Sequence, residues 1–146
     1  MAEESNKKIS EMLFNDVQSM EEVIEKYPKR NLGDGAIVTR FAPSPTGFLH
    51  IGGAMTALLA SRMAQQSDGV FILRIEDTDK KREVDDGVQQ IVDGLEKMGI
   101  QAQESPNTSG EYGPYVQSER EDLYRSFAKK LLGDGNAYTC FCTEDD

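Results

Sequence analysis

The sequence predicts an α/β protein with a parallel sheet and flanking helices, preceded by an amphipathic helix. Residues 36–41 and 70–75 are short apolar runs rich in Val, Ile and Phe, as buried strands are. A loop with proline and glycine and then a stretch of helical periodicity lie between them. Strand, loop, helix and strand in this order make a βαβ unit, which opens a parallel sheet.

Apolar periodicity predicts four helices, at residues 7–27, 52–66, 84–98 and 119–132. Pro28 ends the first of them. Ser118 and Glu121 have the spacing of a capping box at the start of the last. Residues 101–115, rich in Ser, Pro, Gly and Asn, are expected to form a connecting loop.

Composition limits the class of protein. A chain of 146 residues, 38% hydrophobic, suffices for one domain or a piece of one. Its net charge of −10 leaves no basic platform for nucleic acid, whose contacts must then be local or lie outside these residues. Neither a membrane-spanning apolar run nor a secretory signal is visible, so we expect a soluble, cytoplasmic protein with no membrane partner.

The two cysteines, Cys140 and Cys142, are one residue apart, too close for an ordinary disulfide and more suggestive of shared metal ligation. A structural zinc site needs four ligands, so the pair is half a site at most. Zinc is therefore not expected in this chain, and a reduced pair in a strand is the favoured interpretation.

The loop after the first predicted strand has features of a phosphate site. Gly52 and Gly53 would let a nucleotide approach the backbone where the next helix presents unpaired N–H groups. His50, the one histidine, adds a donor there. The pattern is neither Gly-x-Gly-x-x-Gly nor a Walker loop, and a simple turn is the alternative interpretation.

Three carboxylates follow the second predicted strand, in Glu76, Asp77 and Asp79. The carboxyl ends of parallel strands are where ligands bind in open α/β sheets, so these groups are well placed to receive an ammonium ion. Capping of the next helix is the structural alternative.

Two motifs carry a family resemblance. The run Arg40-Phe-Ala-Pro-Ser-Pro-Thr-Gly-Phe-Leu-His-Ile-Gly-Gly-Ala54 closely resembles the nucleotide-binding signature of class I glutamyl-tRNA synthetases, a variant of His-Ile-Gly-His. Ile75-Glu-Asp-Thr-Asp79 is similar to the family's second hallmark, and residues 113–120 and 137–142 resemble its continuation. The likeness spans residues 39–143, which leaves the N-terminal helix as an appendage. The family commonly has arginine where Met55 stands.

The resemblance implies roles for individual residues. Glu76 would bind the amino group of glutamate, while Arg40, Ser44 and the backbone near Ala42 would hold its carboxylate and neighbouring groups. Arginine suits this task because its fork pairs with a carboxylate in a bidentate manner. The residues implied for ATP are Thr46, Gly47, His50, Gly52 and Gly53, with His50 the catalytic residue.

The implied reaction is ATP-dependent formation of glutamyl-adenylate, assisted by Mg²⁺, and transfer of the glutamyl group to tRNA(Glu). The implied fold is the N-terminal half of a Rossmann-like catalytic domain at residues 36–137, after a helical extension at 1–35 and before an inserted region starting at 138–146. A Lys-Met-Ser-Lys-Ser motif is absent, so the chain alone is not expected to charge tRNA.

Two other functions are compatible with the sequence. One is a tRNA-modifying glutamyl transferase of the glutamyl-queuosine type, which resembles this sequence less after the first loop. The other is a non-catalytic binding module, in which the N-terminal helix recruits a partner or an exposed edge strand pairs with another chain.

Overall fold

The computed structural model describes residues 2–143, which form two compact units. The larger is Lys29–Arg120, and the smaller combines residues before 29 with residues after 120. No helix among the described residues is long and apolar enough to cross a membrane.

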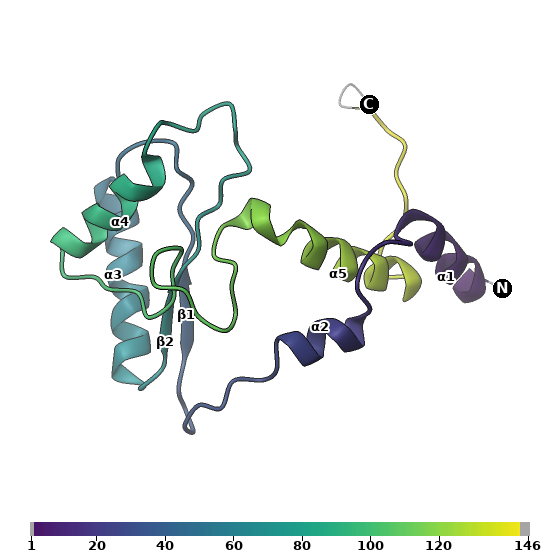
Figure 1. Cartoon of the computed structure of the whole chain (residues 1–146), viewed down its shortest axis with the longest axis horizontal. Coiled ribbons are helices and arrows are strands. Elements are labelled where there is room, and N and C mark those ends of the chain that lie inside the picture. The colour runs from purple at the N-terminus through teal and green to yellow at the C-terminus, as the bar shows by residue number, and fades with distance from the viewer. Residues whose placement is uncertain (1, 144–146) are drawn as a thin grey trace. The chain divides into compact units, whose positions relative to one another are not determined.

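The larger unit is built on the predicted βαβ arrangement. Strands β1 (Val38–Phe41) and β2 (Val70–Leu73) pair in parallel, and helix α3 (Ile51–Gln66) connects them and packs against both (Figure 1). The α/β fold with a parallel sheet is thus confirmed. Both strands are shorter than predicted. Backbone hydrogen bonds continue past the strands, because the Arg74 N–H donates to the Phe41 carbonyl at 3.0 Å and the Glu76 N–H donates to the Pro43 carbonyl at 2.9 Å.

The second edge of β2 is paired with segments of the predicted 101–115 loop and the residues that follow it. Isolated parallel bridges join Ile72 to Glu104 and Ile75 to Val116. The Leu73 N–H donates to the Glu104 carbonyl at 2.9 Å, and the Ile75 N–H donates to the Tyr115 carbonyl at 2.9 Å. Although this loop has no regular strand, its backbone and the Gln103 side chain pair with the polar groups along this edge of β2.

The core lies between the strands, α3 and helix α4 (Gly87–Lys97), which contributes an apolar face. Its buried members include Phe41, Phe71, Leu73, Ile75, Ala57, Ala64, Ile91 and Leu95. Alanines on the inner face of α3 let the helix approach the sheet closely. The large apolar side chains of the same helix are exposed instead: Ile51, Met55, Leu58, Leu59 and Met63.

Helix α4 begins three residues later than predicted, at Gly87 after the N-cap Asp86. Val84 is held before it, because its N–H donates to the Pro45 carbonyl at 3.1 Å. Gly87 is buried against the same loop, and a Cβ there would lie 2.7 Å from the Pro45 oxygen. The loop that carries the predicted nucleotide motif therefore sets where α4 starts.

The smaller unit contains helices α1 (Ala2–Leu13), α2 (Met20–Lys26) and α5 (Glu121–Gly133). The prediction of one helix over residues 7–27 is wrong. Ser19 forms a capping box with Glu22, and this starts a new helix after a break at residues 14–19. Helix α5 contacts both of the others, as Figure 1 shows.

The predicted capping box at the start of the last helix is also wrong. Residues Gln117–Arg120 form a 3-10 turn, η1, and α5 begins at Glu121. The Ser118 hydroxyl does not cap this helix, because it donates to Asp77. The carboxylate of Asp77, 41 positions away in the sequence, thus takes the hydroxyl that would otherwise cap the helix.

Candidate functional site

Five of the predicted site residues line one cavity at the carboxyl end of β1. The cavity has a volume of about 360 Å³ and includes Ser44, Thr46, Gly47, His50 and Gly53 in its wall. Parallel strands of open α/β sheets present their ligand sites at this edge. The lining does not include the other four predicted residues, which are Arg40, Ala42, Gly52 and Glu76.

His50 is the N-cap of α3. Its Nδ1 accepts a hydrogen bond from the Gly52 N–H at 3.1 Å, and its own backbone is extended at φ −86° and ψ 167°. In the neutral ring, the proton must then be on Nε2, which makes that atom a donor. The exposed imidazole thus satisfies one helix N–H and carries a second polar atom.

Side chains of the loop pack closely over two of its glycines, and a third has an unusual backbone conformation. A Cβ on Gly52 would lie 3.0 Å from Cε1 of His50, and one on Gly53 would lie 2.9 Å from Cδ1 of Leu49. Gly47 has φ +148°, a backbone conformation that other residues rarely adopt. Larger residues at Gly52 or Gly53 would therefore have to displace the His50 ring or the Leu49 side chain, and at Gly47 they would strain the backbone.

Arg40 and Glu76 meet at the same edge of the sheet. Nη2 of Arg40 lies 3.7 Å from Oε1 of Glu76, and the Glu76 N–H donates to the Pro43 carbonyl at 2.9 Å. Both side chains are partly exposed, at 45% and 31%. The structure thus places a cation and an anion side by side, as recognition of a zwitterion requires.

Arg74 is a neighbour of this pair for which sequence reasoning proposed no role. Its Nη2 donates to Oε1 of Glu76 at 3.2 Å. Its Nε is buried and has no hydrogen-bond partner among the described residues. The available signal was its position directly after β2, beside Glu76 in the same motif.

The three carboxylates after β2 have different partners. Asp77 is only 5% exposed and accepts hydrogen bonds from the Ser118 N–H and hydroxyl and from Lys80. Burial raises its pKa, but these hydrogen bonds outweigh it and bring the pKa to about 2. Asp79 pairs with Arg82. Glu76 is thus the carboxylate that stands beside Arg40.

A second polar network surrounds Glu104, next to β2. Its two carboxylate oxygens each accept from Arg30 at 2.6 Å, and the Tyr115 hydroxyl donates to it at 2.8 Å. The Arg30 hydrogen bonds lower the pKa of Glu104, while burial and the bond to Glu104 raise the pKa of Tyr115 to about 12. Arg30 also stacks on the Tyr112 ring at 3.7 Å. This network fixes the residues before β1 to the loop that pairs with β2.

Cys140 and Cys142 are exposed and lie in a segment without helix or strand, so their predicted place in a strand is wrong. A backbone hydrogen bond from Cys142 lowers the pKa of Cys140. Across residues 2–143, no group of three or more His, Cys, Asp or Glu side chains is arranged to hold a metal ion.

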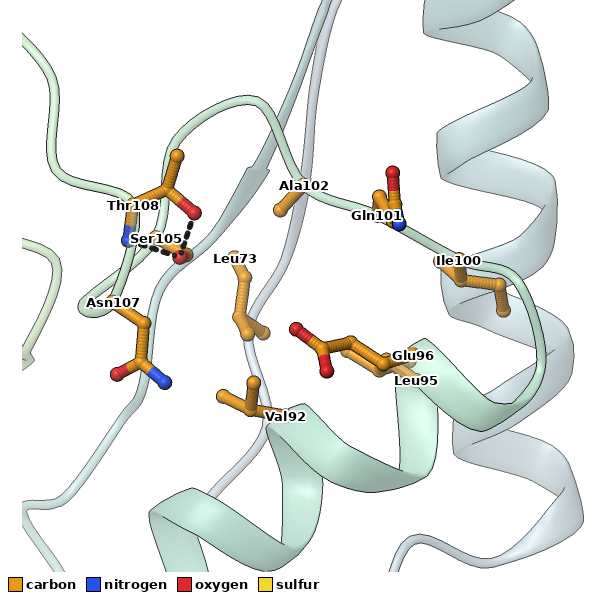
Figure 2. A pocket seen from close by; sticks show the side chains of 10 residues that line it. All are labelled: Leu73, Val92, Leu95, Glu96, Ile100, Gln101, Ala102, Ser105, Asn107 and Thr108. Carbon is orange, nitrogen blue, oxygen red and sulfur yellow. Dashed lines mark hydrogen bonds between the residues drawn. The ribbon is translucent and has the colours of Figure 1, made fainter.

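A separate cavity of about 240 Å³ lies between α4 and residues 100–108 (Figure 2). Leu73, Val92 and Leu95 form its apolar side. On the polar side, the Ser105 hydroxyl bonds to the hydroxyl and the N–H of Thr108, both at 3.0 Å. It contains none of the predicted site residues.

Sequence comparison decides the family. The catalytic domain of the class I tRNA synthetases for Glu and Gln matches residues 36–146. The chain belongs to this family. The motifs at residues 40–54 and 75–79 that resembled it both lie inside the match.

Curated relatives of this synthetase family agree with the assignment. The chain is 48% identical over 147 aligned residues to the glutamate–tRNA ligase of Clostridium beijerinckii, covering 97% of this chain and 27% of that protein. It is also 48% identical over 147 residues to that of Acetivibrio thermocellus, covering 96% and 27%. The chain thus spans about a quarter of the length of these relatives.

A solved synthetase structure has the same architecture. The glutamate tRNA ligase of Elizabethkingia meningosepticum, crystallised in complex with its amino acid, is 45% identical and matches with a TM-score of 0.71. The match covers 75% of this chain and 22% of that one.

The alignments correct one expectation about the N-terminal segment. Residues before 39 were expected to lie outside the likeness. A match over 97% of the chain must include nearly all of them, so the Clostridium relative shares this segment.

Proposed function

We propose that this chain carries the glutamate- and ATP-binding part of a glutamate–tRNA ligase. The observation that carries the proposal is the Arg40–Glu76 pair beside the His50 loop, at the carboxyl end of β1 and β2. Family membership and the names of the relatives support the same substrates, L-glutamate, ATP and tRNA(Glu).

In this proposal Arg40 and Glu76 recognise opposite ends of glutamate. The Arg40 guanidinium pairs with the substrate's side-chain carboxylate, and the Glu76 carboxylate accepts hydrogen bonds from its ammonium group. Ser44 and the backbone at Ala42 hold neighbouring groups. When glutamate binds, the direct contact between Arg40 and Glu76 is replaced by two contacts with the substrate. Arg40 then pairs with its carboxylate, and Glu76 pairs with its ammonium group.

ATP would occupy the cavity beside this pair. Thr46, Gly47, Gly52 and Gly53 shape the loop around the phosphates, and Nε2 of His50 donates to an oxygen of the α/β-phosphates. An oxygen of the glutamate α-carboxylate attacks the α-phosphorus, the bond from that phosphorus to the bridging oxygen breaks, and pyrophosphate leaves. No side chain acts as nucleophile. Mg²⁺ bound to the phosphates would neutralise part of their charge.

The chain holds part of the machinery of the longer enzymes. We propose that it binds glutamate and ATP but does not complete aminoacylation, because it spans about a quarter of its relatives and lacks a Lys-Met-Ser-Lys-Ser motif. The proposed domains are 1–35, 36–137 and 138–146. We also propose a cytoplasmic protein that does not use Cys140 and Cys142 for zinc.

Calorimetric titration with a non-hydrolysable glutamyl-adenylate analogue tests the proposal. The intact chain should bind saturably, and Glu76→Gln and His50→Ala should each weaken binding. Asp68→Asn, on an exposed residue in the turn after α3, is the matched control and should leave binding unchanged. A chain that is folded by circular dichroism and binds nothing would refute the proposal.

A further inference from the structure

Asp77 is the most buried charged side chain in the motif after β2, at 5% exposed. Oδ1 accepts from the Ser118 N–H at 2.9 Å, and Oδ2 accepts from the Ser118 hydroxyl and from Nζ of Lys80 at 2.8 Å. Both oxygens therefore have partners within the protein, and this carboxylate is not available to a ligand as Glu76 is.

The residue before Asp77 in the chain is Glu76, whose backbone is held by the sheet. The Glu76 N–H donates to the Pro43 carbonyl at 2.9 Å. On the other edge, Ile75 bonds to Tyr115 and Gln117, with its N–H and carbonyl at 2.9 and 2.8 Å. The backbone hydrogen bonds to segment 115–117 end at Ile75. Beyond Glu76, the hydrogen bonds between Asp77 and Ser118 attach the chain to the same segment again.

Ser118 is well suited to anchor this link. It is in η1, directly after Gln117, which is itself bonded to the backbone of Ile75. Its N–H and its hydroxyl both donate to Asp77. Hydrogen bonds therefore join segments 75–77 and 115–118 at three successive places, which are Ile75 with Tyr115, Ile75 with Gln117, and Asp77 with Ser118. Glu76 lies between two anchored residues.

We infer that Asp77 is a positioning residue for substrate binding, which holds the Glu76 carboxylate in place to receive the ammonium group of an amino acid. This inference rests on the proposed function of Glu76. It makes the Asp77–Ser118 link part of amino-group recognition, although neither residue touches the substrate. Without the link, the chain directly after Glu76 has lost its attachment to Ser118, and the Glu76 carboxylate is held less firmly beside Arg40.

The test compares two non-hydrolysable analogues, glutamyl-adenylate and the same compound with hydrogen in place of its α-amino group. Calorimetry gives the affinity of the chain and its variants for each. Asp77→Asn and Ser118→Ala should each weaken binding of the amino-bearing analogue about tenfold, the effect of losing one hydrogen bond to a charged group. Binding of the desamino analogue should change less than twofold.

Two variants calibrate the measurement. Glu76→Gln removes the carboxylate itself, so this variant should no longer bind the amino-bearing analogue more tightly than the desamino analogue. Asp86→Asn makes the same chemical change in the same stretch of chain, at a left-handed position that asparagine tolerates and without a side-chain cap bond, and should bind as the intact chain does. Circular dichroism establishes that each variant is folded.

Each outcome has one meaning. If Glu76→Gln loses the preference but Asp77→Asn and Ser118→Ala keep it, or lose affinity for both analogues equally, the positioning role is overturned while the proposed function stands. If the intact chain binds neither analogue, the proposed function fails, and the positioning role fails with it. Selective loss of the amino-bearing analogue in both variants supports the inference.

Discussion

Nη2 of Arg40 lies 3.7 Å from Oε1 of Glu76, although Arg40 is in β1 and Glu76 follows β2, 36 positions later in the sequence. The parallel pairing of β1 with β2 brings them together, because Phe41 is opposite Leu73 in the register. A cation and an anion at this spacing, both partly exposed, can separate around a ligand that offers the opposite charges.

The Arg40 side chain should decide which amino acid is bound. Arg40→Gln is expected to weaken binding of a glutamyl-adenylate analogue by about 2 kcal/mol, because a hydrogen bond between charges is lost. Binding of the glutaminyl-adenylate analogue, whose side chain is uncharged, should weaken much less. Calorimetry with both analogues checks this, and an equal loss for the two would refute carboxylate recognition by Arg40.

His50 should have two separable tasks, as a helix cap and as a donor to the bound ligand. His50→Ala should lower the free energy of unfolding by about 1 kcal/mol, because the acceptor for the Gly52 N–H is lost. His50→Asn keeps a capping acceptor and should retain that stability, yet both variants should bind the glutamyl-adenylate analogue more weakly. Urea unfolding and calorimetry measure the two effects. Full binding by the asparagine variant would show that the ring acts only as a cap.

Gly69 is required where β2 begins. A Cβ there would lie 1.9 Å from the Ile37 carbonyl oxygen, which accepts the first hydrogen bond of the strand pair from Val70. Gly69→Ala should therefore destabilise the chain by about 2 kcal/mol or more in urea unfolding. Gly33→Ala is the control, since a Cβ there meets nothing within 4 Å, and its effect should stay within about 0.5 kcal/mol.

Asp77 should make stability depend on acid pH. Its pKa is about 2 in the folded chain against an ordinary value of 3.8, so its contribution is complete above the higher value and is lost as pH falls through the lower one. The loss should be about 2 kcal/mol. Urea unfolding of the intact chain and of Asp77→Asn from pH 5 to pH 2 measures it. The difference between them should shrink across this range, and a constant difference would contradict the assignment.

The sequence supported prediction where local periodicity and short-range chemistry decide the structure. Strand, loop, helix and strand around His50 follow from apolar spacing and from the positions of proline and glycine. Where longer-range contacts compete, prediction failed. Ser118 has the spacing of a helix cap, but Asp77 takes its hydroxyl, and no pattern within one segment reveals a partner so distant in the sequence.

The N-terminal break shows the same limit at closer range. Apolar residues continue with helical spacing across residues 14–19, and this favoured one helix. The Ser19–Glu22 capping box starts a new helix instead. The N–H groups of Ser19 and Glu22 donate to each other's side chains, whereas in a continuous helix they would donate to carbonyls of the preceding turn. Arg74 beside Glu76 was missed because proximity to a charge partner is a property of the folded sheet.

The inner face of α3 has a practical consequence for mutational studies of this chain. Its buried side chains, Ala54, Ala57 and Ala64, are already alanine, whereas its large side chains are exposed. An alanine scan would leave the helix's contact with the sheet untouched and would report only on its outer surface. A scan in the opposite direction, to valine or leucine, would force the helix away from β1 and β2 and reveal which contacts the fold depends on.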